Sequence, residues 1–233
     1  MLGFQYRQTR DYDNFQIGHF RGEGRYEIPI LQAGEMPPPG IDWISFNFVR
    51  GDKEPEKHAV HFFIDDYQFE RLWDSPLAYL DKMSRYRAVL TPDFSTYNDF
   101  PRAQQVWNKF RNHWMGAFWQ YHGINVIQSV VWTDDPEDDS WVFDGNAPGA
   151  PVAISAMGTS NSQRRKQIFE RGYRAMIERL RPSAIMLYGD IPPVCEPERD
   201  IIVQVPSFVN KWTGRPIQRK EALQWPRMEA TAA

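Results

Sequence analysis

The stretch AVHFFIDDYQFERLW, residues 59–73, decides the fold because an apolar, strand-like run stops abruptly on two carboxylates. Apolar and aromatic residues lead to Asp65 and Asp66, and a helical pattern follows directly. The same order recurs along the chain, where other apolar runs end at Asp93, Asp134 and Asp190. Repeated strand–turn–helix units predict a mainly parallel sheet with helical crossovers.

The composition bounds the class of protein. A chain of 233 residues with 42% apolar and 15% aromatic residues is long and apolar enough for one folded domain with arms, and is not a disordered chain. A formal net charge of -3 argues against a globally basic surface for nucleic acid. Cys195 is the single cysteine, which excludes an internal disulfide and a thiolate-rich zinc site.

The ends and the apolar runs of the sequence bear on its location. The first residues, MLGFQYRQTRDYDNF, lack the apolar core of a secretory signal. No apolar run approaches the roughly 20 residues that a membrane-spanning helix needs. We therefore expect a cytoplasmic protein without membrane contacts.

Three regions follow from the composition along the chain. Residues 1–40 are polar and aromatic and end in the proline-rich GEMPPPG, so we expect an N-terminal arm and a stiff connector. Residues 41–209 form the expected α/β core, and residues 210–233 form a basic tail. Because exposed aromatic residues favour interfaces, the arm is a candidate surface for a homo-oligomer or a host protein partner.

The core pattern predicts strands and helices in alternation. Asp99 and Pro101 precede a long helix to about His122, and a second helix spans about 163–180. An open three-layer α/β sheet fits this order, and an irregular or partial (β/α) barrel is the alternative. The expected strands are 28–31 at an edge, then 42–49, 58–65, 87–93, 124–132, 151–157, 184–189 and 200–206.

The carboxylates after the strands form the first candidate site. The carboxyl ends of parallel strands meet at one edge of a sheet, and ligands bind there. We assign acid–base roles to Asp65, Asp93 and Asp134, with Tyr188 beside them. Oxygen ligands favour Mg²⁺ or Mn²⁺, and the candidate metal ligands are Asp65, Asp93 and Asp190. The alternative is purely structural, because Asp after a strand commonly caps the next helix.

The stretch SAMGTSNSQRRK, residues 155–166, forms the second candidate site. A strand ends, small polar residues follow, and a helix starts with basic residues. Backbone N–H groups at a helix start attract anions, and hydroxyl groups add donors. Capping of this helix by Ser160 or Ser162 is the structural alternative. The candidate phosphate-binding residues are Gly158, Thr159, Ser160, Asn161 and Arg165.

The chain also resembles an uncharacterised domain family that occurs in bacteria, phages and mobile elements. The resemblance is carried by FFIDDYQFERLW, PDFS, INVIQSVVW, FDG, VAISAMGTS and LYG, and covers about residues 42–190. It implies a phage or mobile-element context and carries no assigned activity. The family-like stretches contain Asp65, Asp66, Asp93, Trp132, Asp144, Gly145, Gly158, Tyr188 and Gly189.

These features favour one function and leave a second open. The first is an enzyme that acts on a nucleotide or a nucleic-acid phosphate as a metal-assisted hydrolase. The second is a non-catalytic protein that binds a nucleotide or a protein partner, in an anti-defence or replication role. The carboxylates support the first, whereas a binder needs only the anion-binding loop and an interface.

Overall fold

The computed structural model describes residues 14, 15 and 17–207, and its centre is a seven-stranded sheet in which all neighbours are parallel. The strands follow one another in chain order, so every crossover joins adjacent strands. The α/β prediction is therefore confirmed. The strands are β3 (Asp42–Ser45), β4 (His58–His61), β5 (Ala88–Leu90), β6 (Val126–Ser129), β7 (Val152–Ser155), β8 (Ile185–Tyr188) and β9 (Ile202–Val205).

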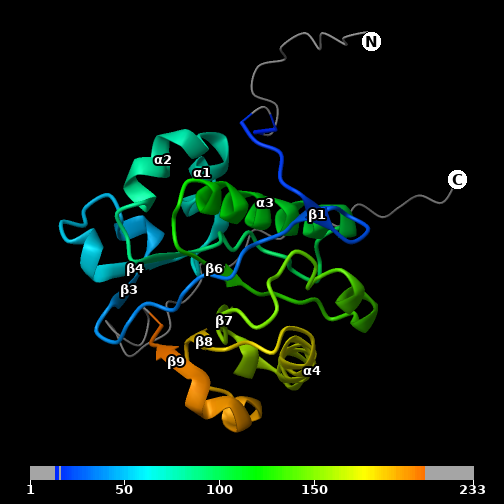
Figure 1. The fold of residues 1–233 in the computed structure, drawn as a ribbon. Coiled ribbons are helices and arrows are strands. Elements are labelled where there is room, and N and C mark those ends of the chain that lie inside the picture. Colours follow the sequence, from blue (N-terminus) through cyan, green and yellow to red (C-terminus); the bar gives the residue numbers. More distant parts are fainter. Residues whose placement is uncertain (1–13, 16, 208–233) are drawn as a thin grey trace, which may run out of the picture.

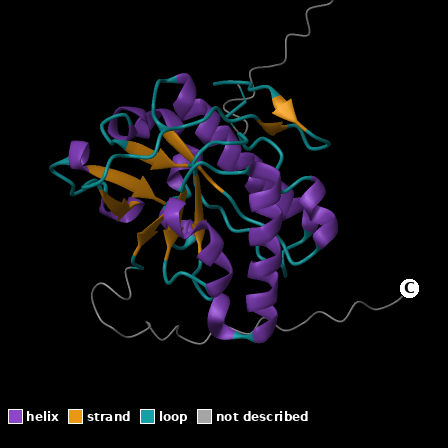
Figure 2. Ribbon diagram, turned by 60° about the horizontal axis from the view of Figure 1, so that its bottom comes forward, coloured by secondary structure: helices purple, strands orange, loops and turns teal. Residues whose placement is uncertain are grey.

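Helices surround this sheet, as Figures 1 and 2 show. In the view of Figure 1, α1, α2 and α3 lie above the strands and α4 lies below them. The α-helices are α1 (Arg71–Asp74), α2 (Pro76–Met83), α3 (Arg102–Tyr121) and α4 (Gln163–Leu180). Short 3-10 helices are η1 (Phe46–Phe48), η2 (Pro55–Lys57), η3 (Asp66–Gln68), η4 (Pro136–Ser140), η5 (Thr159–Asn161) and η6 (Pro193–Ile201).

The sheet curls into a partial barrel rather than lying open between two helix layers. His61 on β4 and Tyr188 on β8 are separated by three intervening strands, yet their ring centroids are 4.7 Å apart. Rings from such distant strands meet only if the sheet bends round to enclose them. The barrel is incomplete, because β3 and β9 form its two unpaired edges in the described part of the chain. The alternative arrangement in the sequence prediction is thus the observed one.

Several strands are shorter than predicted because the chain turns earlier than the apolar pattern does. The run expected as strand 42–49 stops at Ser45, and η1 begins at Phe46. After His61 the chain tightens at once, with the Ile64 N–H donating to the Phe62 carbonyl over 2.7 Å. Phe46 and Phe62 are nevertheless buried, so apolar periodicity continues into turns that pack on the core.

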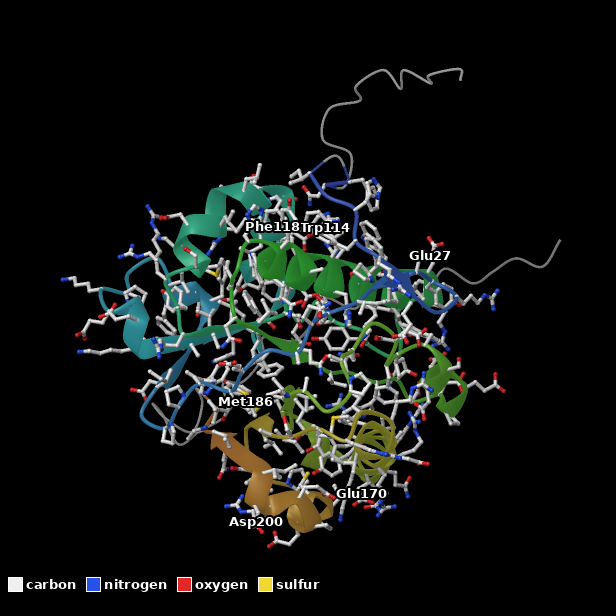
Figure 3. All side chains as sticks on the ribbon, viewed as in Figure 1. Glu27, Trp114, Phe118, Glu170, Met186 and Asp200 are labelled. Carbon is white, nitrogen blue, oxygen red and sulfur yellow. The ribbon has the colours of Figure 1, made fainter. Side chains whose placement is uncertain are left out.

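Helix α3 is buried along most of its length. Trp114 and Phe118 stack at 5.3 Å between centroids and belong to the main core, where Figure 3 shows them side by side. Polar residues on this helix, including Asn108 and Asn112, are buried as well. A helix with both apolar and polar faces buried must be covered on more than one side. By contrast Tyr121, the last residue of α3, is 78% exposed.

The described part of the predicted arm covers the outer side of α3, and residues 17–40 are termed the N-terminal strap. The strap contains a small antiparallel sheet of β1 (Gly22–Glu23) and β2 (Ile28–Pro29), which lies beside α3 in Figure 1. Two reciprocal 2.8 Å hydrogen bonds join Gln32 to Gln120. A partner interface through residues 1–40 stays a prediction, although buried Ile28 already packs within this chain.

The predictions for the two ends of the chain lie outside the described residues. Residues 1–13, 16 and 208–233 are not described, and these include all of the predicted basic tail. In the described residues, every helix is too short or too polar to pass through a bilayer.

The packing of α4 on the sheet yields a test of the fold. Gly172 lies under the indole of Trp132, and a Cβ at this position would overlap that ring. Alanine normally stabilises a helix interior by about 1 kcal/mol relative to glycine. Here we expect Gly172→Ala to lower the free energy of unfolding by about 1–3 kcal/mol, because overpacking outweighs helix propensity.

Urea unfolding followed by circular dichroism measures this change. The double variant Gly172→Ala with Trp132→Leu should recover part of the loss, because the ring that clashes has been removed. A stabilised Gly172→Ala variant would contradict the packing of α4 against Trp132.

Candidate active site

The segments after four successive strands are joined side by side at the carboxyl edge of the sheet, and we call residues 62–70, 91–101, 130–135 and 156–165 the C-terminal rim. Asp66, after β4, accepts hydrogen bonds from Ser95, after β5. Asn98 accepts a 3.2 Å hydrogen bond from the backbone N–H of Asp134, after β6. Asp134 in turn pairs with Arg164 at the start of α4 at 2.7 Å. The rim is therefore continuous, as the sheet topology requires.

Asp93 lies on the part of the rim that is most firmly held. The next residue, Phe94, is gripped by Asn112 of α3: its N–H donates to Oδ1 over 2.8 Å and its carbonyl accepts from Nδ2 over 3.2 Å. The Ser95 carbonyl accepts from Asn108 Nδ2 over 2.6 Å. Ser95 also donates to Asp66 from both its N–H, over 2.9 Å, and its hydroxyl, over 2.8 Å. The backbone beside Asp93 is thus preorganised by neighbours that do not use its carboxyl group.

The carboxyl group of Asp93 is in an unusual environment. Oδ1 is buried and has no hydrogen-bond partner within the described residues, while the residue as a whole is half-buried. Burial, and secondly the nearby charge of Asp66, raise the pKa of Asp93 to about 7. A carboxyl group that changes charge near neutral pH can both donate and accept a proton.

Arg111 of α3 supports the same loop from the interior of the protein. Its guanidinium lies 3.7 Å from the centroid of the Phe94 ring, donates to Asn108 Oδ1 over 2.7 Å and pairs with Glu70. Arg111 therefore fixes the position of Asn108, which holds the Ser95 carbonyl.

The other predicted acidic residues have different surroundings. Asp65 is exposed at the start of η3, and Asp190 is exposed after β8. Asp134 is engaged by Arg164. The described residues contain no group of three or more His, Cys, Asp or Glu side chains placed to hold a metal, so Asp65, Asp93 and Asp190 are not brought together as ligands. Among the predicted acidic residues, Asp93 is the one whose pKa is raised by a neighbouring carboxylate, that of Asp66, in addition to burial.

The predicted phosphate loop converges in part. Gly158 has φ of 74°, and a Cβ there would lie 3.5 Å from Asn161 Nδ2 and 3.6 Å from Arg165 Nη1. These two donors therefore lean over the glycine backbone. The Thr159 hydroxyl donates to the Ala156 carbonyl over 2.8 Å, and Ser162 caps α4 by accepting from the Arg165 N–H over 3.2 Å. Ser160 lies in η5, between Gly158 and Asn161 along this turn.

A group of rings lies inside the barrel next to this loop. Tyr188 is buried and packs against His61 at 4.7 Å and Phe63 at 5.4 Å between centroids. Burial lowers the pKa of His61 to about 3, so its imidazole is neutral, and its Nδ1 has no hydrogen-bond partner in the described residues. The sequence analysis named Tyr188 but missed His61 and Phe63. The spacing in HFF, residues 61–63, which places His61 and Phe63 two positions apart and so on one face of an extended chain, was the available signal.

Two surface hollows lie elsewhere. One, with a volume of ≈ 420 Å³, is lined by residues that include Tyr173, Pro193 and Glu198, and the other follows the outer face of α4 near Arg174. Neither includes a residue of the C-terminal rim. The chemistry described above and these two hollows are thus on different parts of the molecule.

Comparison with known proteins places this chain in a family. The family model described as "Domain of unknown function (DUF4417)" matches residues 20–206, so the chain belongs to this family. It is 36% identical over 205 residues to the Gene 1 protein of Mycobacterium phage L5, covering 84% of this chain and 88% of that protein. It is 38% identical over 170 residues to the Gene 1 protein of Mycobacterium phage D29, covering 73% and 63%. No solved structure matches.

The environment of Asp93 predicts a pH-dependent stability. Its folded-state pKa of about 7 exceeds the ordinary value of 3.8, so the ionised form is disfavoured in the fold. The resulting destabilisation is absent at low pH, grows as the pH rises from about 4 to 7, and is complete above that range. We expect Asp93→Asn to raise the free energy of unfolding at pH 8 by about 1–3 kcal/mol, allowing for partial solvent exposure.

Urea unfolding of both proteins at pH 4.5 and pH 8 measures this effect. The gain should fall to about a quarter of its pH 8 value at pH 4.5, because that pH lies only slightly above the unfolded-state pKa of 3.8. Asp200→Asn, at an exposed carboxylate in η6, is the matched control and should change little at either pH. A loss of stability in Asp93→Asn at pH 8 would mark this carboxylate as a structural acceptor.

Proposed function

We propose that this protein is an enzyme that uses Asp93 for acid–base chemistry on a phosphate-bearing ligand, of the nucleotide or nucleic-acid class, at the carboxyl edge of its partial barrel. The observation that carries the proposal is the Asp93 carboxyl group. One of its oxygens is buried without a partner within the described residues, whereas the backbone of the next two residues is fixed by four side-chain contacts from Asn108, Asn112 and Asp66. A structural carboxylate normally accepts hydrogen bonds from the protein. The backbone next to Asp93 is fixed, but Oδ1 of its carboxyl group accepts none within the described residues.

The position of Asp93 in the fold supports the same conclusion. In parallel α/β folds, ligands bind at the carboxyl ends of the strands. The N–H donors around Gly158 lie at this edge, and the start of α4 adds the positive end of a helix dipole. Phosphate is the common anion that such a set of donors accepts.

The reaction class that fits is hydrolysis. With a pKa near 7, Asp93 in its ionised form can take a proton from an attacking water, and in its protonated form it can give one to a leaving oxygen or nitrogen. Mg²⁺ is commonly held by one or two carboxylates together with substrate phosphates. Assistance by Mg²⁺ or Mn²⁺ therefore remains part of the proposal, with the ion brought by the substrate phosphates and Asp93 kept for proton transfer.

Turnover is the direct test. Nucleoside mono-, di- and triphosphates and short oligonucleotides are incubated with the protein, with and without Mg²⁺ or Mn²⁺, and products are separated by chromatography. We expect one ligand class to be hydrolysed, and Asp93→Asn to lower the rate at least about 100-fold through loss of proton transfer. Asp200→Asn should retain the wild-type rate. A ligand that binds but is always recovered intact would contradict catalysis and favour the non-catalytic binder.

The phosphate loop has its own test. Arg165→Glu reverses a charge beside Gly158, so we expect the affinity for a phosphate ligand to fall at least about tenfold. Isothermal titration calorimetry with the ligand identified above measures the change. Arg174→Glu, which makes the same substitution at an exposed position further along α4, is the control. Equal affinity of wild type and Arg165→Glu would remove Arg165 from the binding site.

A further inference from the structure

Three rings at the barrel mouth, those of His61, Phe63 and Tyr188, are in mutual contact, and we call them the ring cluster. Phe63 and Tyr188 are nearly parallel, at 28° between ring planes, and Tyr188 lies at 41° to His61. Phe63 also stacks on His61, at 27° between planes and 5.9 Å between centroids. His61 and Tyr188 are buried, whereas Phe63 is half-buried. Phe63 is therefore the ring of this cluster with accessible surface, and its contacts with His61 and Tyr188 hold it in place.

The ring cluster adjoins the phosphate loop. Tyr188 on β8 is the register partner of Ser155 on β7, and the Ala156 N–H donates to the Tyr188 carbonyl over 2.9 Å. The chain reaches Gly158 two residues after Ala156. A ligand that places an anion at Gly158 thus has the ring cluster next to it, through Tyr188 on the neighbouring strand.

Apolar surface gathers on the same edge. Among the exposed large apolar side chains of the described residues, Phe48, Tyr67, Tyr97 and Met157 lie in the segments that follow β3, β4, β5 and β7. These four side chains add apolar surface to the edge on which the ring cluster lies. The many carboxylates nearby disfavour a long polyanion and favour a compact ligand with one anionic end.

His61 supplies the second sign of a ligand. The residue is 4% exposed, and its Nδ1 has no hydrogen-bond partner in the described part of the chain. An apolar residue would fill this place in the barrel without leaving a polar atom unsatisfied. The neutral imidazole thus keeps an unsatisfied hydrogen-bonding atom within the ring cluster, beside Phe63 and Tyr188.

From this geometry we infer that the ligand of the Asp93 site is a nucleotide whose base stacks on Phe63, with its phosphate on the donors around Gly158. The inference rests on the proposed function and adds the part of the ligand that is recognised. Stacking on an aromatic face accepts every base, so all common nucleotides should bind and a sugar phosphate should bind more weakly. In the order of the rim segments, Asp93 follows β5, between Phe63 after β4 and Gly158 after β7.

The test compares ligands that differ only in the base. Calorimetry is carried out with AMP, GMP, CMP and UMP, and with ribose 5-phosphate. We expect the nucleotides to bind about 5- to 100-fold more tightly than ribose 5-phosphate. Phe63→Leu should remove most of this difference and Phe63→Tyr should keep it. Tyr121→Leu, at an exposed aromatic residue at the far end of α3, is the control and should leave it unchanged.

The outcomes separate the two proposals. If ribose 5-phosphate binds as tightly as AMP and the binding depends on Arg165, base recognition is overturned while the phosphate site stands. If neither binds and no ligand is turned over, the proposed function fails and the inference fails with it. Should Phe63→Leu not fold, the comparison of AMP with ribose 5-phosphate on the wild-type protein and on Phe63→Tyr still decides.

Discussion

The paired hydrogen bonds between the Asn112 side chain and the backbone of Phe94 are the constraint on which the site depends. Helix α3 is buried between the sheet and the N-terminal strap, so its polar side chains must find partners inside the protein. Asn108 and Asn112, one helical turn apart, find them in the loop after β5. Satisfying the helix and fixing the loop are therefore one event, and the fixed loop carries Asp93.

The same helix is held from its other side. The Trp114 indole N–H donates to the Gly18 carbonyl over 3.1 Å, and His113 Nδ1 donates to the Pro29 carbonyl over 2.9 Å. The strap thus covers the polar and aromatic groups of α3 that do not face the sheet. The family match, which begins at residue 20, includes nearly all of this strap within the domain. The strap is accordingly part of the folding unit and contributes to the rigidity of the Asp93 loop through α3.

The sequence predicted the architecture well where a local pattern was sufficient. Helix α4 begins and ends where its cap and its apolar spacing indicate, and hydrogen bonds and an ion pair link the segments after four successive strands along one edge. The roles of individual carboxylates were beyond the sequence, because Asp66, Asp93 and Asp134 follow strands in the same way. Their difference comes from long-range partners, namely Ser95 for Asp66 and Arg164 for Asp134. The curvature that brings His61 to Tyr188 likewise depends on contacts across the barrel.

The central claim is that Asp93 changes charge near neutral pH because its carboxyl group is buried beside Asp66. Carbon-13 NMR of protein labelled at the aspartate side-chain carboxyl carbons, titrated from pH 3 to pH 9, measures this directly. One resonance should titrate near pH 7 and be absent from the Asp93→Asn spectrum. If every aspartate resonance has finished titrating by pH 5, Asp93 is an ordinary carboxylate and the proposed acid–base site is wrong.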